Sequence, residues 1–259
     1  MRTPNGFTLI ELVVVILLLG VMATFTSQFI STGTQLYADA SAREQLMSDV
    51  RFGVERLNRE VRDAVPGTLS LSSDGQCVSF WPLAAVSRYV SLPLSASGSL
   101  TFLSPMSGVV QAADYAVVYP VGMSPSTPYG CSAGLCVARV SSAPVLVAGE
   151  TQLWSVGLSA IPSGTFGGFA AESPGKRLFF AREQISFCRN GLNQLIREST
   201  LLASGVTSRS VMAEHLTQVR FYQDPQSFHH QGELGVNLTF SQRGETVQFS
   251  HKVEVNNVP

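Results

Sequence analysis

The sequence predicts an α+β protein in which one long N-terminal helix packs on an antiparallel, β-rich C-terminal head. Three observations lead to this prediction. No charged residue occurs from Leu12 to Ala38. Apolar residues then recur at steps of three and four from Leu46 to Ala64, which is the period of an amphipathic helix. After Pro66, short alternating apolar segments are separated by glycine, proline and serine, a pattern typical of strands and turns.

The first half of the predicted helix is long and apolar enough to cross a membrane. A helix rises about 1.5 Å per residue, so residues 7–30 would span about 36 Å, against a hydrocarbon core of about 30 Å. We therefore expect a transmembrane segment at about residues 9–30. Arg2 precedes this segment, and basic residues favour the cytoplasmic side. The N-terminus is accordingly expected in the cytoplasm and the head in the periplasm.

The second half of the helix is predicted to be amphipathic. Its apolar stripe consists of Leu46, Val50, Gly53, Val54, Leu57, Val61 and Ala64, and charged residues occupy the opposite face. We expect this stripe to pack against the head. The turn residues Val65-Pro66-Gly67 are expected to end the helix, which gives a helix at 7–65 and a head domain at 66–259.

The head is predicted to contain a series of short strands. Alternating or apolar segments place them at 77–81, 99–103, 115–119, 135–140, 177–180, 184–188, 192–197, 216–222, 235–240 and 246–255. Asn190-Gly191 is a favourable tight-turn pair immediately before the seventh of these segments. The last three segments predict a terminal antiparallel meander with a hairpin turn at 242–245. Residues 143–175 show no clear pattern.

A short motif stands at the start of the apolar run: Gly6, Phe7, then Thr8-Leu9-Ile10 and Glu11. It resembles the class III signal of type IV prepilins and of type II secretion pseudopilins. The resemblance implies that residues 1–6 are a leader, which prepilin peptidase removes by cutting between Gly6 and Phe7. It also implies N-methylation of the new terminal Phe7, and pairing of Glu11 with the N-terminal amine of a neighbouring subunit.

The chemistry of Glu11 supports this interpretation independently. A lone carboxylate near bilayer depth is costly unless it finds a partner, and an ammonium group would offset much of that cost. An ordinary secretory signal is the rival interpretation, because Arg2 supplies a basic start and Val21-Met22-Ala23 loosely fits a cleavage site. The apolar run, however, continues beyond Ala23 to Ile30. A mature N-terminus at Thr24 would favour the secretory signal, and one at Phe7 the prepilin.

A second resemblance covers residues 43–66. This stretch is similar to the large minor pilins of the mannose-sensitive haemagglutinin (MSHA) pilus, and it shares its general pattern with J-type secretion pseudopilins. It implies a minor pilin of a type IV pilus, located in the initiating or tip complex. The implied partners are major and minor pilins bound through the N-terminal helix, prepilin peptidase, the pilus assembly platform and the inner membrane. A type II secretion pseudopilin and a membrane-anchored periplasmic enzyme are the alternatives.

Four cysteines fit a periplasmic location, where disulfides form. Cys77, Cys131, Cys136 and Cys188 allow three pairings. Only four residues separate Cys131 from Cys136, so we expect a local bridge there and a second bridge between Cys77 and Cys188. The spacing lacks the paired cysteine motifs of a zinc site, and no metal is expected.

Composition and motifs do not favour catalysis or nucleic-acid binding. The net charge of −1 gives no basic surface for nucleic acid. The chain lacks a P-loop, a G-x-S-x-G motif and a dinucleotide fingerprint. Ser173 and Lys176 have the S-x-x-K spacing of some acylating enzymes, but they stand in a Pro-Gly turn. The adjacent pair His229-His230 would face opposite ways on a strand. We expect no catalytic residue, no enzyme activity and no cofactor.

Overall fold

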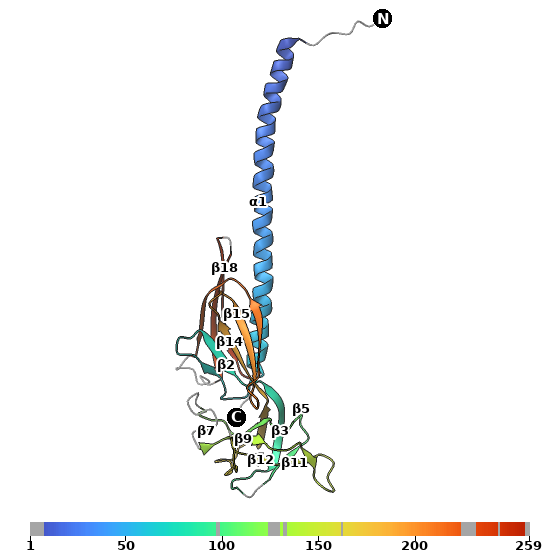
Figure 1. Ribbon diagram of the computed structural model, residues 1–259, viewed down its shortest axis with the longest axis vertical. Helices are drawn as coiled ribbons and strands as arrows, with labels where there is room; N and C mark the ends of the chain where they lie inside the picture. The colour runs from blue at the N-terminus through green and yellow to red at the C-terminus, as the bar shows by residue number, and fades with distance from the viewer. Residues whose placement is uncertain are drawn as a thin grey trace.

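The computed structural model describes residues 8–96, 99–123, 130–131, 134–161, 163–223, 232–242 and 244–256. One helix, α1 (Leu9–Arg62), has 54 residues and is therefore about 80 Å long. Its first half projects away from a β-rich head, and its second half is packed into that head (Figure 1). The predicted α+β class is confirmed.

The C-terminal end of α1 lies earlier than the sequence predicts. The helix ends at Arg62 instead of residue 65, and Asp63 donates its backbone N–H to the Arg59 carbonyl as a cap. Ala64 forms an isolated bridge with Pro82, and the Val65 N–H donates to the Trp81 carbonyl. The prediction is wrong here because these backbone groups bond to the head instead of continuing the helix.

Two antiparallel sheets form the part of the head nearest α1. The described residues of the first sheet make five strands, in the order β1 (Ser70–Leu71), β2 (Cys77–Phe80), β14 (Glu183–Arg189), β15 (Leu195–Leu201) and β16 (Thr207–Ala213). The second is the predicted terminal meander, in the order β17 (Leu216–Tyr222), β18 (Glu233–Gln242) and β19 (Glu245–Glu254).

The second half of α1 lies between these two sheets. It contacts β16 of one sheet and β18 and β19 of the other. The six apolar side chains of the predicted stripe, from Leu46 to Ala64, are buried in one core with residues of both sheets, among them Phe80, Phe187, Leu216 and Phe240. Gly53, the seventh member of the stripe, is also buried. The prediction that the stripe packs on the head is confirmed. Glu60 adds a polar tether, because both of its carboxylate oxygens accept from Arg197 Nε of β15, at 3.0 and 2.9 Å.

The helix α1 lies close to β16 at Gly53. A Cβ atom at this position would lie 3.3 Å from the Met212 carbonyl oxygen, which is tighter than ordinary contact. We expect Gly53→Leu to lower the free energy of unfolding by about 1–3 kcal/mol, because the larger side chain must push the helix and strand apart. Denaturant unfolding of the full chain in detergent would measure this. Gly33→Leu is the matched control, since nothing lies within 4 Å of a Cβ there, and it should leave the head's stability unchanged.

A second lobe of the head is inserted between β2 and β14, and it lies at the end of the molecule far from the N-terminus (Figure 1). We call it the distal lobe. In the described residues its sheet has nine strands, in the order β10 (Val145–Leu146), β11 (Leu153–Val156), β4 (Leu100–Leu103), β3 (Leu83–Ser91), β13 (Arg177–Ala181), β6 (Tyr115–Val117), β9 (Val137–Val140) and β12 (Leu158–Ser159), with β5 (Ser107–Gly108) beside β3. A short ribbon, β7 (Gly130–Cys131) with β8 (Gly134–Leu135), completes the lobe.

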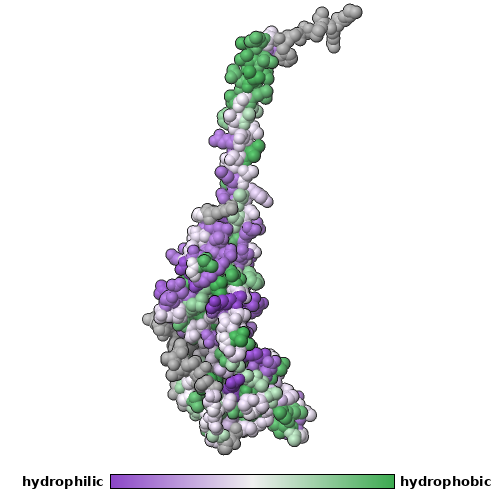
Figure 2. All heavy atoms as spheres, viewed as in Figure 1, coloured by the Kyte–Doolittle hydropathy of each residue, from purple (hydrophilic) through white to green (hydrophobic). Residues whose placement is uncertain are grey.

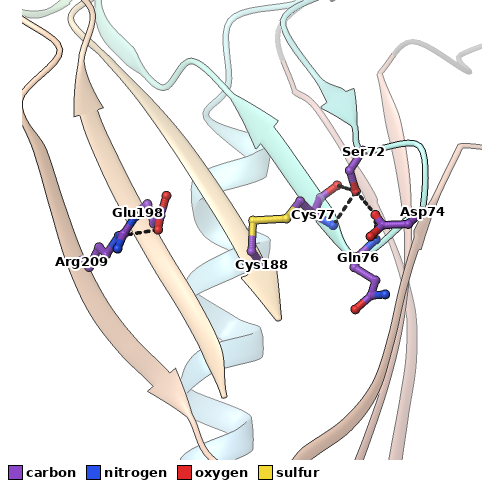
Figure 3. Close-up of a disulfide and its surroundings, with 7 residues drawn as sticks. All are labelled: Ser72, Asp74, Gln76, Cys77, Cys188, Glu198 and Arg209. Atoms are coloured by element: carbon purple, nitrogen blue, oxygen red, sulfur yellow. Dashed lines mark hydrogen bonds and ion pairs between the residues drawn. A yellow bond between two sulfur atoms is a disulfide. The ribbon is translucent and has the colours of Figure 1, made fainter. Parts of the chain in front are cut away.

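The strands that flank this insertion are direct neighbours. Phe80 of β2 is in register with Ile185 of β14, and Cys77 with Cys188. A disulfide joins Cys77 to Cys188 (Figure 3). Beside it, the Ser72 hydroxyl donates to the Asp74 carboxylate, and this bond holds the pKa of Asp74 below its ordinary value. The chain thus leaves and re-enters the five-stranded sheet at adjacent strands that are covalently linked.

A separate core joins the distal lobe to the rest of the head. It contains Val65, Trp81, Tyr115, Val117, Phe179 and Ala181. Asp114 and Arg182 form an ion pair at this junction, with Arg182 Nε 2.8 Å from Asp114 Oδ1 and Nη2 3.0 Å from Oδ2. Hydrogen bonding to Asp114 raises the pKa of Arg182. Arg182 is the residue between β13 of the distal lobe and β14 of the five-stranded sheet. The ion pair therefore anchors the chain where it passes from the distal lobe back into that sheet.

Candidate functional site

The start of α1 has a defined cap. Thr8 is in an extended conformation, and its Oγ1 accepts the backbone N–H of Glu11 at 3.4 Å. This T-x-x-E spacing is that of a capping box, and the Glu11 carboxylate lies in the first turn, where the helix dipole favours negative charge. The sequence carries this capping signal, although it was not used to predict the helix start. Glu11 is therefore held at a fixed position at the tip of the helix.

The first half of α1 makes no contact that buries it. Every side chain from Leu9 to Ser41 is exposed in the single chain, and Figure 2 shows apolar side chains covering the outer end of the helix. Within the described residues, α1 is the one helix that is long and apolar enough to cross a membrane. A surface of this kind needs lipid or other apolar helices around it. This half of α1 is therefore the candidate functional segment.

The threonine hydroxyls of this segment form hydrogen bonds within the helix itself. The hydroxyls of Thr24, Thr26, Thr32 and Thr34 each donate to a backbone carbonyl three or four residues earlier. Among the described residues, the Glu11 carboxylate has no hydrogen-bond or ion-pair partner. It is also the only charged residue from Thr8 to Ala38. Burial of this helix in an apolar assembly thus leaves one group in need of a cationic partner.

The predicted processing residues Gly6 and Phe7 lie outside the described residues. The predicted cysteine residues are placed: Cys77 is bonded to Cys188, and Cys131 to Cys136. These are the two pairings that the sequence analysis expects. The first fastens the two strands that flank the distal lobe, and the second closes the short β7–β8 ribbon within it.

The candidate catalytic motif at Ser173 has a structural role in the distal lobe. Ser173 is buried, and its Oγ accepts the backbone N–H of Arg177 at 3.2 Å. Its backbone N–H donates to the Tyr89 hydroxyl at 2.9 Å, and burial raises the pKa of that tyrosine. His229 and His230 lie outside the described residues. Within the described ranges, no three histidine, cysteine or acidic residues are grouped to hold a metal.

Comparison with known families identifies the N-terminal segment. Residues 1–27 match the prokaryotic N-terminal methylation motif. The chain thus carries a type IV pilin-like methylation motif, which implies a pilus-type prepilin processing system, and the motif runs directly into the apolar half of α1. The motif and this helix fit a membrane-anchored protein. Comparison with curated proteins finds no match, and neither does comparison with solved structures.

Proposed function

We propose that this protein is a minor pilin, a structural and assembly subunit of a type IV pilus of the MSHA type. The observation that carries the proposal is the continuity between the methylation motif and an apolar helix whose side chains are exposed from Leu9 to Ser41. Such a helix can pass from the inner membrane into the apolar centre of a filament, where other pilin helices replace the lipid. The choice of the MSHA type rests on the resemblance of residues 43–66 to the large minor pilins of that pilus.

The distal lobe supports a location in the initiating or tip complex. It lies beyond the C-terminal end of α1, on the side away from the N-terminus (Figure 1). In a helical shaft, subunits are staggered along the axis, so a lobe that extends the head along this axis would enter the space of the subunits ahead of it. At the tip that space is free. A bulky head of this kind is therefore best accommodated in the first subunits to assemble.

The proposed topology places the N-terminus in the cytoplasm and the head in the periplasm, and later at the cell surface. The proposed partners are other major and minor pilins through α1, prepilin peptidase and the pilus assembly platform. Two disulfides in the head suit the oxidising periplasm. We propose no catalytic activity and no cofactor; the burial and hydrogen bonding of Ser173 support this proposal.

A pseudopilin of a type II secretion system is the second candidate, because the methylation motif and the helix support it equally well. Deletion of the gene distinguishes the two. Loss of pili with normal protein secretion supports the pilin, and loss of secretion with normal pili supports the pseudopilin. If both processes remain normal and a periplasmic reaction is lost, the membrane-anchored enzyme would replace both.

Processing of the N-terminus is the direct test of the proposed function. Mass spectrometry of the mature protein should find a chain that begins at N-methylated Phe7. Gly6→Val should leave the leader attached, because the branched side chain adds bulk beside the bond to be cut, whereas Asn5→Ala, one residue further away, should be processed normally. A mature chain that begins at Thr24 would contradict the proposal and identify an ordinary secretory signal.

A further inference from the structure

The distal lobe ends in an exposed apolar arm. The arm consists of β10 and β11, at one edge of the nine-stranded sheet. Six consecutive apolar residues, Ala143 to Ala148, run along it, and each is at least partly exposed. Figure 2 shows apolar side chains gathered at this end of the head. A continuous exposed apolar run of this length is unfavourable in water and typically marks an interaction site.

The backbone of β10 is open on its outer side. Val147 donates its N–H to the Leu153 carbonyl, and Leu146 is in register with Trp154. Hydrogen-bonded and non-hydrogen-bonded pairs alternate in an antiparallel ladder, so the N–H and C=O of Leu146 point away from β11. No other strand of the described residues pairs with this side of β10. An incoming extended chain can therefore bond to Leu146.

A groove lies on the adjacent face of the arm. It has a volume of about 260 Å³, and its walls include Phe102, Pro105, Val109, Val110, Pro144 and Trp154. The Trp154 indole N–H already donates to Ser104 Oγ at 3.1 Å, so the ring presents apolar surface to the groove. Small-molecule sites usually measure about 300–1,000 Å³. This groove is smaller, and suits one large side chain of a partner better than a whole ligand.

The surroundings of the groove determine the charge of its partner. Residues 89–113 and 140–149, which supply most of its walls, contain no charged residue. Arg182 reaches the wall from outside these segments, where its Nη2 donates to the Val109 carbonyl at 2.9 Å, but its charge is already paired with Asp114. A charged partner segment would lose its hydration there without gaining an ion pair. A membrane surface is also disfavoured, because surfaces that dock on lipid usually carry lysine or arginine beside the apolar residues. An uncharged segment of a protein fits all these features.

We propose that the arm and groove bind an extended, uncharged peptide segment of a partner protein. The segment pairs with the outer side of β10, and one large apolar side chain fills the groove. In such β-strand addition the main-chain bonds give affinity and the pocket gives specificity. This inference goes beyond the proposed pilin role, and it does not depend on that role, because α1 contributes nothing to the groove.

The test uses the full chain in phosphatidylcholine nanodiscs and three blocked heptapeptides of alternating threonine and valine. Their central residue is phenylalanine, leucine or alanine, and each carries a fluorescent label for anisotropy measurements. The phenylalanine and leucine peptides should bind saturably, and the alanine peptide at least about tenfold more weakly, a difference of about 1.4 kcal/mol. Empty nanodiscs control for binding to lipid.

Matched variants test each half of the site. Val109→Glu places a charge at the mouth of the groove, where Val109 is 67% exposed, and should weaken binding at least about tenfold. Val90→Glu is its control, since Val90 is 53% exposed and lies outside the groove. Leu146→Pro removes the outward N–H but keeps the β10–β11 pair, so it should abolish pairing of β10 with the peptide. Leu146→Ala keeps this N–H, and it should bind the peptide more tightly than Leu146→Pro does. Near-ultraviolet circular dichroism confirms that each variant is folded.

Three outcomes would overturn the proposal. The first is the absence of saturable binding up to about 1 mM peptide. The second is equal binding by the wild type and Val109→Glu. The third is self-association of the wild type, measured by sedimentation, if Val109→Glu abolishes that self-association. This result would assign the groove to a second copy of the chain.

Discussion

Replacing Arg182 with methionine is expected to lower the free energy of unfolding of the head by about 3 kcal/mol, because the substitution leaves the buried carboxylate of Asp114 without its counter-charge. The Asp114 side chain is only 1% exposed, whereas the Arg182 side chain is 37% exposed. The partial exposure of Arg182 places the effect at the lower end of the range for buried pairs. Asp114 keeps the backbone N–H of Gln111 as a donor, but one neutral bond cannot replace a bidentate guanidinium.

Denaturant unfolding of the full chain in detergent would measure this effect through Trp81, which lies in the junction core with its ring centroid 5.7 Å from that of Tyr115. The double variant with Asp114→Asn should be more stable than Arg182→Met alone, since a neutral amide needs no counter-charge. Arg209→Met is the matched control. Its ion pair with Glu198 (Figure 3) involves an arginine 72% exposed, and its loss should cost at most about 1 kcal/mol. Equal losses in the free energy of unfolding for the Arg182 and Arg209 variants would show that the buried pair stabilises the head no more than an exposed pair does.

The sequence predicted α1 well because its two halves follow simple physical rules. An uncharged apolar run and a stripe with helical period are local patterns, and burial of the stripe follows from its amphipathic character. All seven predicted stripe residues are buried, six of them in the core shared with both sheets. The end of the helix was misplaced by three residues, because its position depends on backbone bonds with residues of the head: Val65 donates to the Trp81 carbonyl, and Leu83 donates to the Asp63 carbonyl.

The strands were predicted where alternation is clear and missed where it is not. β17 matches its predicted range, whereas β15 begins at Leu195 instead of residue 192. The reason is the side chain of Asn190, whose Oδ1 accepts the N–H groups of Leu192 and Gln194 and lengthens the turn. β16 was missed because five of its seven residues are exposed and mostly polar. The region 143–175 holds β10, β11 and β12, which are too short to show a period.

The insertion of the distal lobe could not be predicted from local patterns. It is defined by the pairing of β2 with β14 across more than one hundred residues, and only the Cys77–Cys188 separation of 111 hinted at it. The same limit applies to the groove, since Phe102, Val109 and Trp154 come from separate segments of the chain. The processing motif was different: it is short and contiguous, so the residues that carry the proposed function could be identified without any tertiary information.

Glu11→Ala is expected to reduce pilus assembly, or formation of the tip complex, by at least about tenfold, while the head stays folded. Each isolated charge taken into an apolar assembly costs several kcal/mol, and about 1.4 kcal/mol already corresponds to a tenfold change. In the wild type, the Glu11 carboxylate of one subunit pairs with the amine that cleavage before Phe7 creates on its neighbour. Each charge then offsets the free-energy cost of burying the other. In the variant the amine of the neighbour is buried without a partner, so insertion of the subunit becomes unfavourable.

Electron microscopy of piliated cells and co-purification of other minor pilins would measure this loss. Glu44→Ala is the matched control, because Glu44 is exposed on the same helix but lies beyond the apolar segment, and it should assemble normally. Mass spectrometry must show that Glu11→Ala is still processed at Phe7, so that the defect lies in assembly and not in cleavage. Because Glu11 is the sole charged residue between Thr8 and Ala38, no other side chain in this segment can replace it. Normal piliation and normal co-purification in a processed Glu11→Ala variant would therefore rule out its role as the partner of the neighbouring amine.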